Sequence, residues 1–151
     1  MAFPIVSHLF TCPVCLFHPT LEELKRITYE STPASVIEFI ATKEAVHPMK
    51  SLNDLRIRLG AGRRVLSLFH PMLENQPLLF VHVALTDHIP SSMEQVMELL
   101  PHEHPSCATF YSITNAQPGL AGIGLGEHLL KESIHVSDRL YIFMYDRTLL
   151  L

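Results

Sequence analysis

The chain has 151 residues, of which 48% are hydrophobic, and this length is sufficient for one domain with a buried core. Its formal net charge of -4 argues against a nucleic-acid-binding surface, which needs clustered lysines and arginines. No apolar run approaches the roughly 20 residues that cross a bilayer, and three cysteines are too few for a disulfide framework, so we expect an intracellular protein that acts neither on nucleic acid nor in a membrane.

Residues 1–19 are predicted to form an irregular leader. They include side chains with the types and roughly the spacing of a small zinc site, namely His8, Cys12, Cys15 and His18. No second cysteine pair accompanies Cys12 and Cys15, and no β-α-β pattern typical of a redox motif surrounds them. We therefore predict no metal site, and the role of these two cysteines stays open.

Residues 20–62 are predicted to form a helical segment. The first helix is expected from Thr20 to Tyr29, because Thr20 and Glu23 have the spacing of a capping box. Its apolar residues recur at helical spacing: Leu21, Leu24 and Ile27. A second helix is expected with Thr32 as its N-cap and Pro33 as its first residue, running through Ile40, and a third between Ser51 and Gly60.

Residues 63–151 show both strand and helix patterns. Strands are predicted over residues 65–69 and 78–86, and the turn between them favours an antiparallel pair. A helix is expected next, because Ser91 and Glu94 have capping-box spacing. A strand, a helix and a strand follow, over residues 107–114, 127–131 and 139–145. This order indicates an α/β (α+β) fold with at least one parallel crossover.

A glycine-rich loop over residues 115–126 joins the strand at 107–114 to the next helix. Such a loop leaves backbone N–H groups free at the positive end of the helix, and glycines let a diphosphate approach the backbone. Glycine spacing alone is also typical of a tight turn between a strand and a helix. The pattern therefore fits both an anion site and a plain tight turn.

Segments along much of the chain resemble the malonyl-CoA decarboxylase family in order and spacing. They are Glu44-Ala-Val-His47-Pro48, Arg63-Arg64, Glu74 to Pro77, His82-Val-Ala-Leu-Thr86, Ser91-Ser92, Phe110-Tyr-Ser112-Ile113, and Gln117 with Gly119-Leu120 and Gly122. The resemblance covers residues 21–133. It implies that residues 20–62 end a helical domain, and that residues 63–151 form a partial acetyltransferase-like (GNAT-like) catalytic domain, with a mixed sheet and flanking helices.

The same resemblance implies an activity. The family converts malonyl-CoA to acetyl-CoA and carbon dioxide, in fatty acid metabolism, with no metal or organic cofactor. Losing carbon dioxide leaves an enolate, so the site needs hydrogen-bond donors aimed at the thioester oxygen and an acid that protonates the carbon. By position, the family's catalytic serine is Ser112.

Two segments match the family's substrate-binding positions. The first lies at the start of the helix predicted after residue 90 and consists of Ile89, Pro90, Ser91, Ser92, Met93, Glu94 and Gln95. The second lies in the glycine loop, which in the family binds the CoA pyrophosphate, and consists of Gln117, Gly119, Leu120, Gly122 and Gly124.

The family's acid-base histidine lies much further along the chain and has no counterpart that we can assign. His135 occurs where the resemblance has already ended, and His47 and His82 fit better as structural residues, with His82 a satisfied histidine of the core. We therefore expect a short form or fragment of a decarboxylase that lacks this histidine.

Two other interpretations stay open: a non-catalytic CoA-ester-binding or regulatory relative of the family, and a plain interaction module whose glycines only turn the chain. The expected partners are malonyl-CoA and a second copy or a full-length relative, because a partial sheet exposes an edge that favours pairing. The resemblance implies the cytoplasm, mitochondria or peroxisomes, and no visible targeting signal chooses among them.

Overall fold

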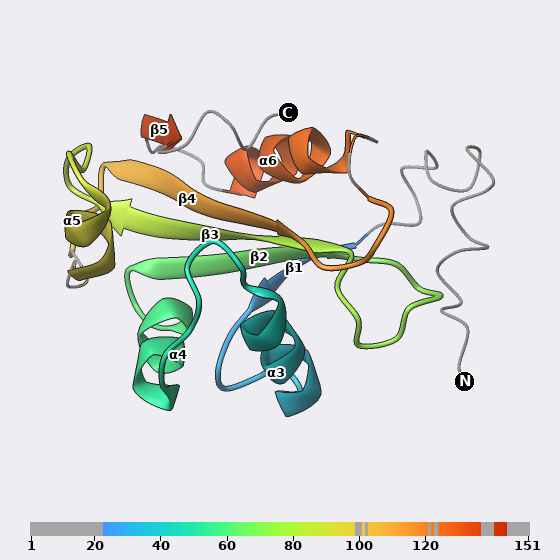
Figure 1. Cartoon of the computed structure of the whole chain (residues 1–151). Helices are drawn as coiled ribbons and strands as arrows, with labels where there is room; N and C mark the ends of the chain where they lie inside the picture. Colours follow the sequence, from blue (N-terminus) through green and yellow to red (C-terminus); the bar gives the residue numbers. More distant parts are fainter. Residues whose placement is uncertain are drawn as a thin grey trace.

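The computed structural model describes residues 23–98, 101, 103–120, 122, 124–136 and 141–144. Within these residues the chain forms one sheet and four helices (Figure 1). In chain order the elements are β1 (Glu23–Ile27), α3 (Ala34–Lys43), α4 (Leu52–Leu59), β2 (Arg63–Phe69), β3 (Leu79–Thr86), α5 (Met93–Glu98), β4 (Cys107–Asn115), α6 (Leu125–Val136) and β5 (Tyr141–Met144).

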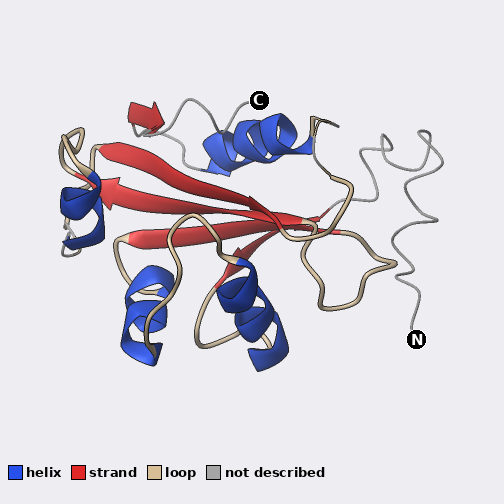
Figure 2. Cartoon of the chain, in the orientation of Figure 1, coloured by secondary structure: helices blue, strands red, loops and turns tan. Residues whose placement is uncertain are grey.

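The sheet has the strand order β1-β2-β3-β4-β5. The first four strands are antiparallel neighbours, whereas β5 pairs with β4 in parallel after the crossover through α6. Helix α6 covers one face of the sheet, and α3 and α4 cover the other (Figures 1 and 2). Helix α5 lies at the end of the sheet where β3 ends and β4 begins. The predicted antiparallel pair and parallel crossover are both confirmed.

The face toward α6 carries a continuous apolar core. Leu125, Leu129 and Leu130 form the buried side of α6, at the spacing of an amphipathic helix. They pack over alternate residues of the central strands: Leu66, Leu68, Leu79, Val81, Val83, Leu85, Ala108 and Phe110. Every residue of β3 is buried, because helices cover both faces of the sheet.

The opposite face carries two separate apolar clusters. The first joins α3 and α4 to the sheet and contains Ile27, Val36, Ile37, Ile40, Leu55, Leu59, Val65, Phe80 and Ala116. The second joins α5 to the sheet and contains Ala84, Val96 and Tyr111. Between the two clusters lie buried polar residues that form the candidate site described below.

Local signals set the helices on this face. Helix α4 begins after Ser51, whose hydroxyl accepts the Asp54 N–H at 3.1 Å, and it ends before Gly60 as predicted. Helix α5 is capped one residue later than expected, because the Ser92 hydroxyl accepts the Gln95 N–H at 3.3 Å. The Gln95 side chain in turn accepts the Ser91 N–H at 2.8 Å. Ser91, Ser92 and Gln95 together therefore cap the start of α5.

The helix predicted from Thr20 to Tyr29 is wrong, because Glu23–Ile27 is the edge strand β1 and residues 20–62 are therefore not wholly helical. A spacing of three residues puts two side chains on one side of a helix but on opposite faces of a strand. Leu24 accordingly packs against the cluster on the α6 face, and Ile27 belongs to the cluster under α3 and α4. Pairing with β2 therefore accommodates both apolar residues.

Candidate active site

Strand β4 is irregular beside the predicted catalytic serine. Ser112 lies opposite His82 of β3, whereas Val83 lies opposite Phe110, so Tyr111 is an extra residue in β4. This is a β-bulge. As a result, Tyr111 packs against Ala84 and α5, and Ser112 contacts Glu44. Two successive side chains of β4 therefore lie on the same side of the sheet. Ser112 lies within the strand, three residues before its end at Asn115.

The loop after α3 brings a carboxylate to this bulge. Glu44 Oε1 accepts the backbone N–H groups of Val46 at 2.9 Å and His47 at 2.8 Å, which turns the chain tightly after the helix. Arg58 of α4 donates to the His47 carbonyl at 2.6 Å. Arg58 is also held by two hydrogen bonds to Asp54, at 2.8 and 3.1 Å. The position of Glu44 is therefore fixed by both helices of this face.

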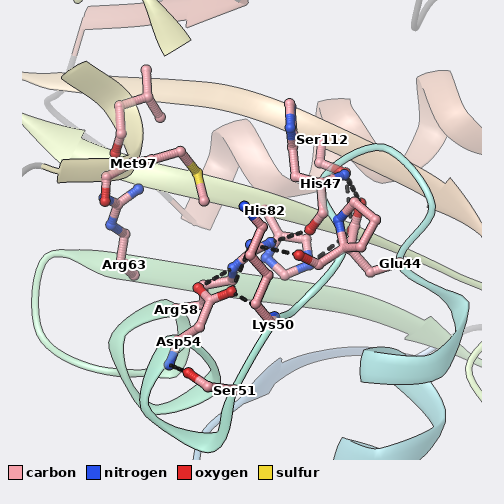
Figure 3. A network of polar contacts seen from close by, with 12 residues as sticks. Glu44, His47, Lys50, Ser51, Asp54, Arg58, Arg63, His82, Met97 and Ser112 are labelled. Atoms are coloured by element: carbon pink, nitrogen blue, oxygen red, sulfur yellow. Dashed lines mark hydrogen bonds and ion pairs between the residues drawn. The ribbon is translucent and has the colours of Figure 1, made fainter. Parts of the chain in front are cut away.

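Glu44 and Ser112 are in direct contact although 68 residues separate them in sequence. The Ser112 hydroxyl donates to the carboxylate, with Oγ at 3.0 Å from both Oε1 and Oε2. Thr114 Oγ1 lies 3.4 Å from Oε2, and His82 Nε2 lies 3.1 Å from the same oxygen. Figure 3 shows the side chains of Glu44, His82 and Ser112 directed toward one another. We call these four residues the Glu44 cluster.

The carboxylate in this cluster is ionised. Burial raises the pKa of Glu44, but the contact with His82, the His47 N–H and the Ser112 hydroxyl outweigh burial and lower it to about 2. Burial also lowers the pKa of His82, and the adjacent carboxylate opposes that shift only in part. At neutral pH the cluster therefore contains a charged Glu44 and a neutral His82.

His82 is buried as predicted but is not a satisfied histidine. Its ring lies between aromatic side chains, with centroids 5.7 Å from both Phe80 and Tyr111. Although Nε2 is near Glu44, neither ring nitrogen forms an aligned hydrogen bond with any residue that the structure describes. His47 also lies beside the site, 6.0 Å from the ring of Tyr111.

A buried cation borders the site on the side of α5. Arg63 donates through one guanidinium nitrogen to the carbonyls of Val96 and Met97, in the last turn of α5. Its guanidinium also lies 5.7 Å from the centre of the Tyr111 ring. Burial lowers the pKa of Arg63. This contact attaches α5 to the strand pair that carries the Glu44 cluster.

The predicted phosphate loop lies beyond the end of β4, ahead of α6. Gly119, Gly122 and Gly124 all have positive φ angles, and a side chain at any of them would point into open space. Gln117 and Leu120 are instead buried; the Gln117 amide donates to the Pro77 carbonyl at 3.2 Å, and Leu120 joins the core under α6. The two buried residues anchor the loop and the glycines leave its backbone accessible.

The second predicted binding segment lies elsewhere. Residues 89–95 follow the end of β3 and lead into α5, whereas the glycine loop follows the end of β4. Because β3 and β4 are antiparallel, the two segments lie at opposite ends of the sheet (Figure 1). Ile89 is exposed and Pro90 is buried, and the hydroxyls of Ser91 and Ser92 are used in the α5 cap. The structure therefore does not bring the two segments together.

Other features lie outside this site. A groove of about 670 Å³ beside β1 is lined by residues such as Arg26, Thr32 and His70, and by none of the predicted site residues. Within the described ranges there is no group of three or more His, Cys, Asp or Glu side chains arranged to hold a metal. Cys12 and Cys15 fall outside those ranges. Among the helices that the structure describes, none is long and apolar enough to span a membrane.

Comparison with known proteins agrees with the fold and with the family resemblance. Residues 20–140 match the family model of the malonyl-CoA decarboxylase C-terminal domain. Over 117 residues the chain is 39% identical to the mitochondrial malonyl-CoA decarboxylase of Anser anser anser, which covers 74% of this chain and 23% of that protein. The crystal structure of malonyl-CoA decarboxylase from Rhodopseudomonas palustris is 40% identical with a TM-score of 0.74, covering 85% of this chain and 32% of that one.

A more distant structure identifies the fold class. An aminoglycoside acetyltransferase from an uncultured soil metagenomic sample superimposes with a TM-score of 0.55 over 86% of this chain and 81% of its own, at 14% identity. The sheet with its parallel β4–β5 pair therefore has the acetyltransferase-like fold that the family resemblance implied. Within that class, the chain belongs to the malonyl-CoA decarboxylase family, and it spans about a quarter of the length of the curated relatives it matches.

Proposed function

We propose that the chain binds malonyl-CoA and acts in its decarboxylation to acetyl-CoA and carbon dioxide. One structural observation carries the proposal: strand β4 links the Glu44 cluster to an open glycine loop at the start of α6. Family membership makes a CoA thioester the ligand to test. The two features then correspond to an acyl site at Ser112 and a diphosphate site at the loop.

The spacing of the two sites suits one extended CoA ester. From Ser112 to the end of β4 at Asn115 the strand advances about 10 Å, a distance that the flexible pantetheine arm can cover. Strand β5 pairs only with Cys107–Phe110, so beyond Phe110 that edge of β4 has no partner strand among the described residues. We propose that the pantetheine arm lies along this edge and delivers the acyl group to the buried Ser112.

The chemistry requires little from the protein beyond orientation and charge. The bond between the carboxyl carbon and the α-carbon breaks, and its electron pair passes to the thioester oxygen as an enolate, which hydrogen-bond donors stabilise. The α-carbon then takes a proton. An ionised Glu44 has no proton to give, and His82 is neutral. We therefore assign Ser112 to the acyl group and place the proton donor outside the Glu44 cluster.

Residues 89–95 are proposed as a second contact with the substrate. Met93 of this segment packs against the cluster that contains Tyr111, the residue before Ser112, so a CoA anchored at the glycine loop approaches this segment only through its acyl end. Alanine at both Ser91 and Ser92 tests this assignment. If the segment contacts the acyl group, the affinity for malonyl-CoA falls while the affinity for free CoA is unchanged.

Partners and location are proposed from the family alone. The curated relative from Anser anser anser is named mitochondrial, and an intracellular compartment suits a CoA ester. We further propose that the chain associates with a second copy or with a longer family member. Mixing with such a protein, followed by size-exclusion chromatography with light scattering, tests the association. Elution as a monomer in every mixture would refute it.

The main experiment is isothermal titration with malonyl-CoA, paired with release of radiolabelled carbon dioxide. Gly122→Asp puts a negative charge into the loop, and Gly122→Asn is its matched control, because both residues tolerate a positive φ and differ mainly in charge. We expect the Asp variant to bind at least tenfold more weakly than the Asn variant, a loss of about 1.4 kcal/mol. No binding by the unaltered chain, or equal affinities of the two variants, would contradict the diphosphate site.

A non-catalytic CoA-ester-binding role is the second candidate. It is favoured by the burial of Ser112 and by the ionised state of Glu44, which leaves that carboxylate without a proton to donate at neutral pH. That role predicts the same binding and the same effect of Gly122→Asp, with release of carbon dioxide at background level. The radiolabel assay therefore separates the two candidates.

A further inference from the structure

Ser112 has one hydroxyl proton, and Glu44 accepts it. The Ser112 Oγ lies 3.0 Å from both oxygens of the Glu44 carboxylate. A malonyl carboxylate bound to the same hydroxyl would have to compete for that proton. The hydroxyl would then lie between two carboxylates, one from the protein and one from the substrate.

The Glu44 carboxylate is fixed in place next to Ser112. Its side chain is buried, and Oε1 also accepts the backbone N–H groups of Val46 and His47. Arg58 holds the same loop through the His47 carbonyl. His82, the remaining polar neighbour on β3, is neutral at pH 7 and does not cancel the charge. A fixed negative charge therefore lies directly behind Ser112.

We infer that Glu44 is a positioning residue that opposes binding of the malonyl carboxylate at Ser112 and so favours its departure as carbon dioxide. The inference rests on the proposed function, because it requires a malonyl thioester at Ser112. It gives the buried carboxylate a role in the energetics of the reaction and not only in the packing of the loop after α3.

The movement of charge during the reaction sets the direction of the effect. A malonyl carboxylate that accepts a hydrogen bond from Ser112 lies about 6 Å from Glu44. When the carbon–carbon bond breaks, the electron pair stays with the α-carbon and spreads to the thioester oxygen, while the carboxyl group leaves as neutral carbon dioxide. The α-carbon then takes a proton from water or from an acid outside the Glu44 cluster. Glu44 thus repels the reactant more than the transition state, and only such a difference raises the rate.

A purely structural role for Glu44 predicts a different pattern. If the carboxylate only held the loop, its replacement would weaken the binding of every CoA ester or leave all of them unchanged. Repulsion predicts tighter binding of malonyl-CoA together with slower turnover, because a strained ground state is relieved. The separation of KM from kcat therefore distinguishes the two roles.

The test compares Glu44→Gln with Glu38→Gln. The first keeps the shape of the buried side chain and removes its charge, and the second makes the same change at an exposed position on α3. Titrations with malonyl-CoA and with free CoA are combined with release of radiolabelled carbon dioxide. We expect Glu44→Gln to bind malonyl-CoA about tenfold more tightly, with unchanged affinity for CoA, and to lower both KM and kcat. Glu38→Gln should match the unaltered chain.

A second measurement uses the unaltered chain and stays decisive if Glu44→Gln does not fold. In the carboxamide analogue of malonyl-CoA the charged carboxylate is replaced by a neutral amide of similar shape. We expect this analogue to bind the unaltered chain about tenfold more tightly than malonyl-CoA. Equal affinity for the two esters, or a preference for malonyl-CoA, would overturn the inference.

The outcomes separate this inference from the proposed function. If Glu44→Gln binds malonyl-CoA no more tightly than the unaltered chain, or tightens malonyl-CoA and CoA equally, the inference fails and the proposed function stands. Binding of malonyl-CoA without turnover in the unaltered chain overturns the claim that Glu44 promotes loss of carbon dioxide. If the unaltered chain binds none of these esters, the proposed function itself fails.

Discussion

Strand β3 has one uniformly apolar face and one face with a polar interruption. Toward α6 its successive residues all belong to a single apolar core: Leu79, Val81, Val83 and Leu85. Toward α3 and α4, Phe80 and Ala84 are apolar, but His82 between them contacts Glu44. The same strand therefore stabilises the fold on one side and carries the candidate chemistry on the other.

The difference between the two faces shows where buried polar groups make folding less favourable than an apolar core would. A buried carboxylate beside a neutral imidazole is expensive to desolvate, and apolar residues of similar volume often serve a fold equally well. The α6 face shows that this sequence can form an extensive apolar core. The buried polar residues on the other face are consistent with the functional role that we propose for them.

The largest effect that we expect comes from the apolar face. Leu129 of α6 is fully buried in the core against β3. Leu129→Ala should lower the free energy of unfolding by roughly 2–5 kcal/mol, because it removes buried methyl groups and leaves a cavity. Urea unfolding followed by circular dichroism measures the loss. If the two faces have separate roles, the folded variant keeps the relative affinities for malonyl-CoA and CoA; a changed ratio would break the comparison.

The next effect concerns the charge on the polar face. The pKa of Glu44 falls from an ordinary 4.5 to about 2 on folding, so its ionisation stabilises the protein above about pH 4.5. This contribution, up to about 3 kcal/mol, is lost as the pH falls toward 2. Glu44→Gln should therefore be less stable than the unaltered chain at pH 7, and the difference should shrink as the pH falls from about 4.5.

Urea unfolding at a series of pH values checks this expectation. Glu38→Gln provides the control, because Glu38 is exposed on the same helix and should show no such pH-dependent difference. A stability difference for Glu44→Gln that stays constant from pH 7 to pH 2 would show that the loss comes from packing and not from the carboxylate charge.

Much of the fold could be predicted because its signals are local. The Ser51 cap, the end of α4 at Gly60 and the glycine loop before α6 all lie within a few residues of the elements they define. Strand β1 could not be predicted from local signals, because the spacing of Leu24 and Ile27 fits a helix as well as a strand that is covered on both faces. Only pairing with β2 decides between the two.

The candidate site was predicted less completely than the fold. Ser112 was assigned through the family resemblance, whereas Glu44 was only part of a matching segment and had no assigned role. The contact between these residues joins positions 68 apart, and no local pattern encodes such a distance. The bulge at Tyr111 also has no local sequence signal, because it is defined by the register between β3 and β4. The turn from Glu44 to His47, which places the carboxylate, was likewise not predicted and is seen only in the structure.

A smaller effect is expected at Ser112. Ser112→Ala removes a 3.0 Å hydrogen bond to the charged Glu44, which should lower the free energy of unfolding by about 1–2 kcal/mol at pH 7. The carboxylate keeps the N–H groups of Val46 and His47, so the loss is smaller than for Glu44→Gln. Because one donor is gone, the pKa of Glu44 should rise and the acid limb of the stability profile should move to higher pH. An unmoved acid limb would show that Ser112 and Glu44 are not coupled.

The smallest effect is expected at Thr114, which faces the same carboxylate at a greater distance. Its Oγ1 lies 3.4 Å from Glu44 Oε2, near the limit for a hydrogen bond, whereas Ser112 reaches both oxygens at 3.0 Å. Thr114→Val keeps the shape of the side chain and removes the hydroxyl, so we expect a change of less than about 0.5 kcal/mol in urea unfolding. The affinity for malonyl-CoA should not change. A loss of unfolding free energy as large as that of Ser112→Ala would mean that Thr114 stabilises the Glu44 carboxylate as strongly as Ser112 at the bulge does.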